Sequence, residues 1–128
     1  MSKMLKQIST DKAPKAVGPY SQAIVTGSLV YLSGQIGLDP ATSALADGVE
    51  DQLVQIMKNI DAVLTASGSD FDHVVKTTIY LIDMADYTKV NEMYATYFPK
   101  ICPARSCVSV AALPRGAKIE VEVVAEVA

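Results

Sequence analysis

The chain has no tryptophan, a single histidine and only two cysteines, and these shortages exclude several kinds of site. Cys102 and Cys107 are too few for a disulfide framework, so we expect two reduced thiols in a reducing compartment. His73 has no second histidine and no CxxC motif beside it, which leaves no ligand set for a metal ion. We therefore predict a structural or solvent-facing role for His73 and no metal.

The chain also lacks a strong charge and a long apolar run. Its net charge is −3 and its lysines and arginines are scattered, which argues against a nucleic-acid partner. No apolar run is long enough for a signal peptide or a membrane span. Half of the residues are hydrophobic, which argues against disorder. We expect one domain, residues 1–128, that is soluble and cytoplasmic.

Two runs near the C-terminus, residues 103–110 and 119–123, alternate in the two-residue period of a β-strand. Residues 113–116 between them are a turn signal, so we predict that the two runs form a hairpin. If the valines of both strands face the core, Arg105 and Glu120 emerge on the same face of the sheet, together with Cys107.

This pair of residues has chemical meaning. An arginine binds a planar carboxylate through two parallel hydrogen bonds. A glutamate beside it can take a proton from water and return it. Arg105 and Glu120 together would suit a small carboxylic acid that reacts with water, but a cross-strand ion pair on a solvated face explains the same spacing.

The rest of the chain predicts four further strands and two helices. The strands are expected at residues 3–8, 23–26, 29–33 and 74–82, and the helices at residues 48–67 and 84–98. Asp47 and Glu50 resemble a capping box at the start of the first helix, and Asp83 is expected to cap the second. Two helices cannot cover both faces of six strands, so they should share one face. The other, partly apolar face then favours a homo-oligomer.

Several motifs together resemble the Rid family (reactive intermediate/imine deaminase), and its RidA-type subfamily in particular. They are residues 18–23 (GPYSQA), 33–35 (SGQ), 91–94 (NEMY), 103–108 (PARSCV), 113–117 (LPRGA) and 119–121 (IEV). They span essentially the whole chain, so the resemblance rests on many positions at once.

The resemblance implies a chorismate-mutase-like α+β fold: a six-stranded mixed sheet with two helices on one face. It also implies a homotrimer with active sites in the clefts between subunits. The implied activity is hydrolysis of 2-iminobutanoate and 2-iminopropanoate, in equilibrium with their enamines, to 2-oxo acids and ammonia. These reactive compounds arise when pyridoxal-phosphate enzymes dehydrate serine or threonine, and the resemblance implies no cofactor or metal in the deaminase itself.

The resemblance also assigns roles to residues. Arg105 resembles the family's carboxylate-binding arginine, and Glu120 resembles the acid that positions the hydrolytic water. The substrate pocket would be lined by Tyr20, Ser33, Gly34, Asn91 and Cys107. Cys107 is expected to be a pocket wall, because neither motif holds a histidine to activate its thiol.

Two other functions fit the sequence less well. A non-catalytic protein that senses 2-oxo acids, or a chaperone-like interaction protein, could use the same fold and the same pocket. An isomerase that acts on a dicarboxylate such as chorismate would need more than one pocket arginine. Turnover of imines distinguishes the deaminase from the sensor, and an assay of chorismate turnover distinguishes it from the isomerase.

Overall fold

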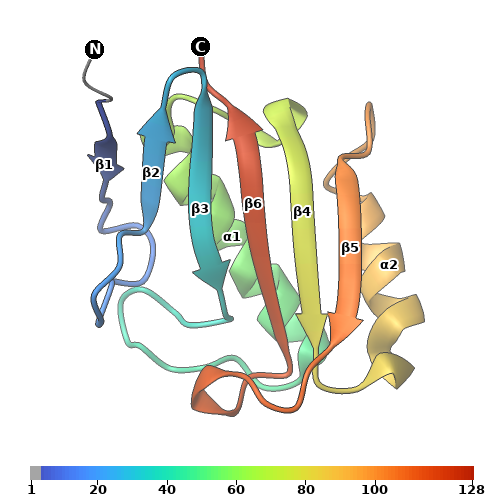
Figure 1. Ribbon diagram of the computed structural model, residues 1–128. Helices are drawn as coiled ribbons and strands as arrows, with labels where there is room; N and C mark the ends of the chain where they lie inside the picture. The colour runs from blue at the N-terminus through green and yellow to red at the C-terminus, as the bar shows by residue number, and fades with distance from the viewer. Residues whose placement is uncertain (1–3) are drawn as a thin grey trace.

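The computed structural model describes residues 4–128 as a six-stranded mixed sheet with two helices (Figure 1), the α+β class that the sequence predicts. The elements are β1 (Lys6–Ile8), β2 (Ala23–Thr26), β3 (Leu29–Gln35), α1 (Val49–Ser67), β4 (Val74–Leu81), α2 (Tyr87–Ala95), β5 (Ala104–Ser109) and β6 (Ile119–Glu126). Residue 3, the first of the predicted edge strand, lies outside the described residues. No helix between residues 4 and 128 is long and apolar enough to cross a membrane.

The strands lie in the order β1-β2-β3-β6-β4-β5, and all pairs are antiparallel except β4 with β5. The predicted hairpin is therefore wrong, because β4 lies between β5 and β6. The chain from residue 110 to residue 118 passes the end of β4 instead (Figure 1). Every second residue of β6 is buried, a pattern that suits an inner strand with partners on both sides, whereas β5 forms the edge.

The strand register places Arg105 and Glu120 on opposite faces of the sheet, which corrects the predicted shared face. Cys107 pairs with Ile79, which pairs with Val121 on its other side, so these three side chains share the face that packs on the helices. Arg105 is two residues from Cys107 and points the same way. Glu120, next to Val121, points to the other face.

The error came from the assumption that the valines of both strands face the core. This assumption holds for β6, where Val121 is fully buried. In β5 it fails, because Val108 is 44% exposed. A strand at the edge of a sheet has less core to face, so its burial cannot be inferred from alternation alone.

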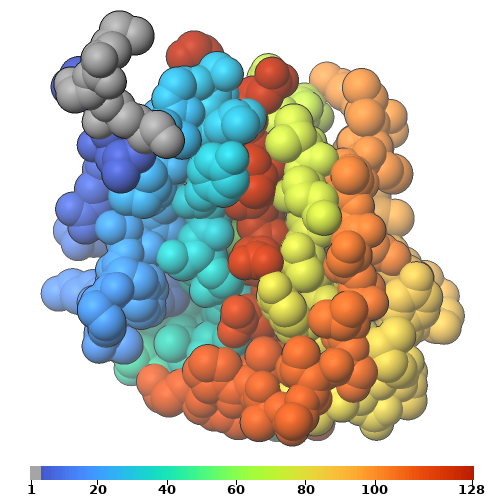
Figure 2. All heavy atoms as spheres, in the orientation of Figure 1, coloured from blue at the N-terminus to red at the C-terminus, as the bar shows by residue number. Residues whose placement is uncertain are grey.

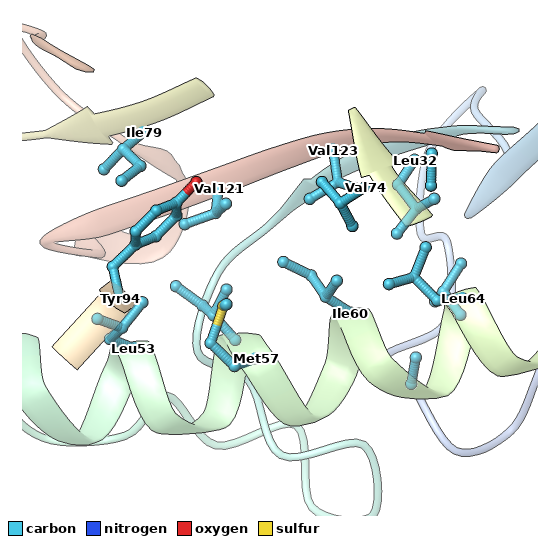
Figure 3. Packing of buried hydrophobic residues seen from close by; sticks show 14 of the residues in the cluster. Leu32, Leu53, Met57, Ile60, Leu64, Val74, Ile79, Tyr94, Val121 and Val123 are labelled. Carbon is cyan, nitrogen blue, oxygen red and sulfur yellow. The ribbon is translucent and has the colours of Figure 1, made fainter. Parts of the chain in front are cut away.

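Both helices cover one face of the sheet, as predicted, and the core lies between α1 and the central strands (Figures 1 and 3). One side of α1 forms an apolar stripe in which Val49 is partly buried and the following members are buried: Leu53, Ile56, Met57, Ile60, Val63 and Leu64. In Figure 3 the side chains of α1 point toward those of Val121, Val123 and Leu32. Burial of such side chains stabilises a fold by about 1.5–3 kcal/mol each.

The ends of the helices differ from the prediction in part. Gly48 and not Asp47 is the N-cap of α1, and no side chain caps the helix there, so the predicted capping box is absent. Gly68 ends α1 in the left-handed conformation, at φ 81°, as expected of a C-terminal glycine. Asp83 caps a short 3₁₀ turn, Met84–Asp86, and regular α-helix follows only from Tyr87 to Ala95.

No helix within residues 4–128 covers the other face of the sheet. Figure 2 shows this face, where the side chains of the strands lie in rows in front of the molecule. Tyr31 and Val108 on this face are 47% and 44% exposed. This surface is the one that carries Glu120.

Candidate active site

A cavity of about 420 Å³ opens beside the start of β6 and the end of β3. Its wall combines Tyr20 and Gly34 with Glu120, three of the residues singled out from the sequence. Apolar side chains such as Val17, Leu38 and Pro40 make up much of the remaining wall. A pocket that combines apolar walls with converging polar groups is typical of a small-molecule site.

Glu120 and Gly34 are in close contact across the pair β3–β6. A Cβ atom added to Gly34 would lie 2.8 Å from Cδ of Glu120, so the carboxylate uses the space that a side chain at Gly34 would fill. Gly34 lies in the irregular part of β3, where the register shifts between Leu32 and Gln35. Such a bulge re-aims side chains at the edge of a functional site.

The half-buried Glu120 carboxyl has a perturbed acidity. Burial, and then the negative charge of Glu122, raises its pKa above the usual 4.5. A carboxylate with a raised pKa is a stronger proton acceptor than an ordinary glutamate. No lysine or arginine within residues 4–128 lies within 4.0 Å of this carboxylate.

Ser33 precedes Gly34 of the cavity wall, does not line the cavity itself, and holds a neighbouring loop. Its hydroxyl donates to the carbonyl oxygen of Ser21 at 2.6 Å, and its N–H donates to the carbonyl of Gln22 at 2.9 Å. The buried Gln22 amide in turn donates to the carbonyls of Thr10 and Pro14. These bonds hold the segment that presents Tyr20 to the cavity.

Sequence reasoning missed two cations in the cavity wall, Lys15 and Arg115. Arg115 donates from Nη2 to the carbonyl of Ser43 at 3.1 Å. Arg115 and Ser43 have φ values of 61° and 62°, the only positive values outside glycine among residues 4–128. The turn at residues 113–116, which belongs to the LPRGA motif, was the available signal, but the resemblance assigns no pocket role to Arg115.

Arg105 is held by α2 on the opposite face of the sheet. Its Nη1 donates to Oδ1 of Asn91 at 2.7 Å, and its Nη2 donates to the Tyr87 hydroxyl at 3.1 Å. Its Cζ also lies 5.7 Å and 5.1 Å from the ring centroids of Tyr87 and Tyr94. Residues 87, 91 and 94 share one side of a helix, which explains why one arginine contacts all three.

This arrangement leaves part of the guanidinium available. A guanidinium has five N–H donors, and two of them are used by Asn91 and Tyr87. The remaining donors of Arg105 can bind the two oxygens of a carboxylate. The contacts to α2 limit the rotamers of the side chain, so less entropy is lost when a ligand binds.

Cys107 and His73 do not have the features of catalytic groups. Burial raises the pKa of the Cys107 thiol, which disfavours the reactive thiolate. His73 is exposed, and its Nδ1 contacts Asp70 at 2.6 Å in a pair that does not line the cavity.

The residues predicted for the site thus form two groups in one chain. Tyr20, Gly34 and Glu120 surround the cavity, with Ser33 behind them, whereas Arg105, Asn91 and Cys107 lie on the helix-covered side of β5. A molecule in contact with Glu120 cannot reach Arg105 of the same chain through the sheet.

Comparisons with known proteins identify relatives that match most of the chain. The model of the family described as Endoribonuclease L-PSP matches residues 10–127. Reactive Intermediate Deaminase A, chloroplastic, of Arabidopsis thaliana is 56% identical over 119 residues, which are 92% of this chain and 64% of the plant protein. The 2-iminobutanoate/2-iminopropanoate deaminase of Mus musculus is 51% identical over 121 residues, 94% of this chain and 90% of the mouse protein.

A solved structure agrees with the fold. A Yersinia pestis protein of the conserved Rid protein family has a TM-score of 0.95 and 48% identity to this chain. The superposition covers 97% of this chain and 100% of the Yersinia chain.

Proposed function

The chain belongs to the Rid family, whose model is described as Endoribonuclease L-PSP, and on that premise we propose that it hydrolyses 2-imino acids to 2-oxo acids and ammonia. The substrates we propose are 2-iminobutanoate and 2-iminopropanoate, the compounds in the name of the mouse relative. The observation that carries this proposal is the half-buried Glu120 carboxyl, whose pKa is raised and which faces a cavity of about 420 Å³.

The chemistry needs a proton acceptor and an anchor. Arg105 binds the substrate carboxylate, and Glu120 accepts a proton as a water oxygen bonds to C2 of the imine. Glu120 returns this proton to the nitrogen, which gives a carbinolamine. Glu120 then takes the proton of the carbinolamine hydroxyl and passes it to the nitrogen, so that the C2–N bond breaks and ammonia leaves as the C2 carbonyl forms. An imine already reacts with water, so the main task of the protein is to hold both reactants in the right orientation.

The site must combine two copies of the chain if Arg105 and Glu120 act on one substrate, because they lie on opposite faces of one sheet. We propose a homotrimer in which the Arg105 edge of one subunit meets the Glu120 cavity of the next. The uncovered, partly apolar face of the sheet supports this proposal (Figure 2), because such a face is a natural surface for a second subunit.

The reaction is tested by an imine-hydrolysis assay. An amino-acid oxidase generates the imine in the cuvette, and semicarbazide traps whatever imine survives. The proposal predicts that this protein accelerates the loss of imine, so that less imine is trapped. Arg105→Ala should not accelerate this loss. If the wild-type protein does not accelerate the loss but still binds 2-oxobutanoate, a sensing role replaces the enzymatic one.

The shared site is tested by mixing two inactive variants, Arg105→Ala and Glu120→Gln. After co-refolding, a subunit with intact Arg105 meets a subunit with intact Glu120 at about one interface in four, so about a quarter of the wild-type activity should return. If the two residues act within one subunit, the mixture stays inactive. Analytical ultracentrifugation of the same samples measures the size of the assembly.

The family description raises the question of ribonuclease activity. A ribonuclease of the usual acid–base type relies on histidines, and His73 is exposed and away from the cavity wall. The net charge of −3 also disfavours a polyanionic substrate. The deaminase is therefore the function that the site supports best.

A cytoplasmic location is part of this proposal. Cys102 and Cys107 are free thiols, which suits a reducing compartment. The proposed reaction needs only water, imine and the side chains described here. Small-molecule imino and 2-oxo acids are accordingly the partners we propose besides the other subunits.

A further inference from the structure

The uncovered sheet face carries two polar side chains beside Glu120 that the proposed reaction does not use. Glu122 follows Glu120 by two residues in β6, so both carboxylates project from the same face. Tyr80 is the cross-strand partner of Glu120 in β4. Its hydroxyl reaches diagonally and donates to Oε1 of Glu122 at 2.7 Å.

We propose that Glu122, held in place by the Tyr80 hydroxyl, is a positioning residue that makes Glu120 a stronger proton acceptor for the attacking water. This inference rests on the proposed function, because it explains how Glu120 would be prepared for that role. Neither Glu122 nor Tyr80 lines the cavity, so both act through Glu120.

The physical argument is the repulsion between two neighbouring carboxylates. A second negative charge on the same face favours the protonated form of Glu120, and the pKa of Glu120 is accordingly raised by Glu122 in addition to burial. The effect depends on where the Glu122 carboxylate sits, because a freely rotating side chain would turn toward water and away from Glu120. The bond to Tyr80 removes that freedom.

Tyr80 is suited to this task. Its hydrogen bond to Glu122 raises the pKa of its phenol, with further contributions from burial and from the charges of Glu122 and Glu120. The hydroxyl therefore stays protonated as a donor throughout the neutral range.

The other charged and titratable groups near Glu120 and Glu122 lie on the uncovered sheet face and in the cavity wall. Tyr31 of β3 and Lys76 of β4 line the groove beside Glu122, and the cavity wall contains Tyr20, Lys15 and Arg115. Within residues 4–128, none of the ion pairs involves Glu120 or Glu122. Within one subunit, Glu122 is thus the group whose charge raises the pKa of Glu120 in addition to burial. Arg105 of the next subunit faces the same cavity in the proposed homotrimer, and it stays in place in every variant compared below.

The first test measures the ionisation of Glu120 directly. We would label the glutamates with ¹³C in the assembled protein and follow the side-chain carboxyl signal of Glu120 against pH in the wild type and in Glu122→Gln. Glu120→Gln identifies the signal by its disappearance. The proposal predicts that the midpoint of the Glu120 titration moves to lower pH in Glu122→Gln.

The matched control is Glu126→Gln. Glu126 lies on the same strand and the same face as Glu120 and Glu122, but at the exposed far end of β6. This variant loses the same charge from the protein, so a non-specific effect of net charge would move the Glu120 midpoint in both variants. The proposal predicts that it moves in Glu122→Gln alone.

The role of Tyr80 is tested by a double-mutant cycle. Tyr80→Phe should move the Glu120 midpoint in the same direction as Glu122→Gln but by less, because the freed carboxylate turns partly toward water. Added to Glu122→Gln, Tyr80→Phe should cause no further movement, since the charge it positions is gone. Equal movements in both backgrounds would show that Tyr80 acts on Glu120 independently and would overturn its assigned role.

The kinetic counterpart is the pH profile of kcat/KM for imine hydrolysis. The acidic limb, which reports protonation of the base in the free enzyme, should move to lower pH in Glu122→Gln. A merely structural role would lower kcat/KM at every pH and leave the limb in place. An unmoved titration of Glu120 overturns the inference, whereas an inactive wild type with a shifted titration overturns the proposed function and leaves the coupling intact.

Discussion

The carboxylate of Glu120 lies against the bare backbone of Gly34, in the space where any other residue would have its Cβ. We predict that Gly34→Ala displaces this carboxylate and lowers kcat/KM for imine hydrolysis by about 100-fold, as small misplacements of a catalytic group do. The free energy of unfolding should change by less than about 1 kcal/mol, because the clashing atoms are the end of a flexible side chain. Steady-state kinetics and urea denaturation measure the two effects separately.

At Gly37, the same replacement by alanine should reduce the stability of the protein. A Cβ on Gly37 would lie 2.7 Å from Cα of Gln52, which belongs to the backbone of α1 and cannot rotate away. We predict that Gly37→Ala lowers the free energy of unfolding by about 1–3 kcal/mol, the usual cost of overpacking. If Gly37→Ala is as stable as Gly34→Ala in urea, the close approach of α1 to residue 37 is not as rigid as the structure indicates.

Arg105 should not tolerate replacement by lysine. A lysine ammonium cannot contact Asn91 and Tyr87 and also bind both oxygens of a carboxylate. We predict that Arg105→Lys lowers kcat/KM by about 100-fold, equivalent to the loss of one or two charge-assisted hydrogen bonds. Activity close to that of the wild type would mean that positive charge alone suffices and that the fork geometry is irrelevant.

The variant should remain folded, which keeps the kinetic result interpretable. Arg105 lies on the edge strand β5 and is only half-buried, so its loss leaves the core of α1 and the central strands intact. The thermal midpoint of Arg105→Lys and the size of the assembly check this directly.

Local patterns in the sequence predicted the elements well, and the reason is physical. The apolar stripe of α1 and the alternation in β6 are determined by which side chains must avoid water, and both are visible within a few residues. The left-handed glycine at Gly68 is equally local. Partner choice between strands is not local, because alternation identifies the faces of a strand and not its neighbours. The parallel pairing of β4 with β5 was missed for this reason.

The candidate site was predictable residue by residue but not in its arrangement. Motif resemblance pointed to Arg105 and Glu120, yet their placement on opposite faces follows from the strand register, which the sequence does not display. Arg115 was missed because a turn motif was interpreted as a connection and not as part of a wall. Tyr80 and Glu122 were missed because they contact each other diagonally across two strands that are far apart in the chain.

The raised pKa of Glu120 makes a prediction about stability and pH. Between the unfolded pKa near 4.5 and the higher folded value, the folded protein binds more protons at this site than the unfolded chain does. The slope of the unfolding free energy with pH is proportional to protons bound in the unfolded state minus protons bound in the folded state, so it is negative here. Ionisation of Glu120 therefore lowers the free energy of unfolding as the pH rises through this window, and the free energy of unfolding stays lowered above it.

We accordingly predict that Glu120→Gln, which cannot ionise, loses hydrolysis but gains thermal stability over the wild type at pH 7.5. At pH 4 and below, the carboxyl is protonated in both folded and unfolded chains, so most of the gain should disappear. Glu126→Gln, at the exposed end of β6, is the matched control. The difference between its thermal midpoint and that of the wild type should be the same at pH 4 and at pH 7.5. If Glu120→Gln and the wild type have the same thermal midpoint at pH 7.5, the folded protein holds the Glu120 carboxylate at no cost in stability. Burial would then not raise the pKa of Glu120 for catalysis.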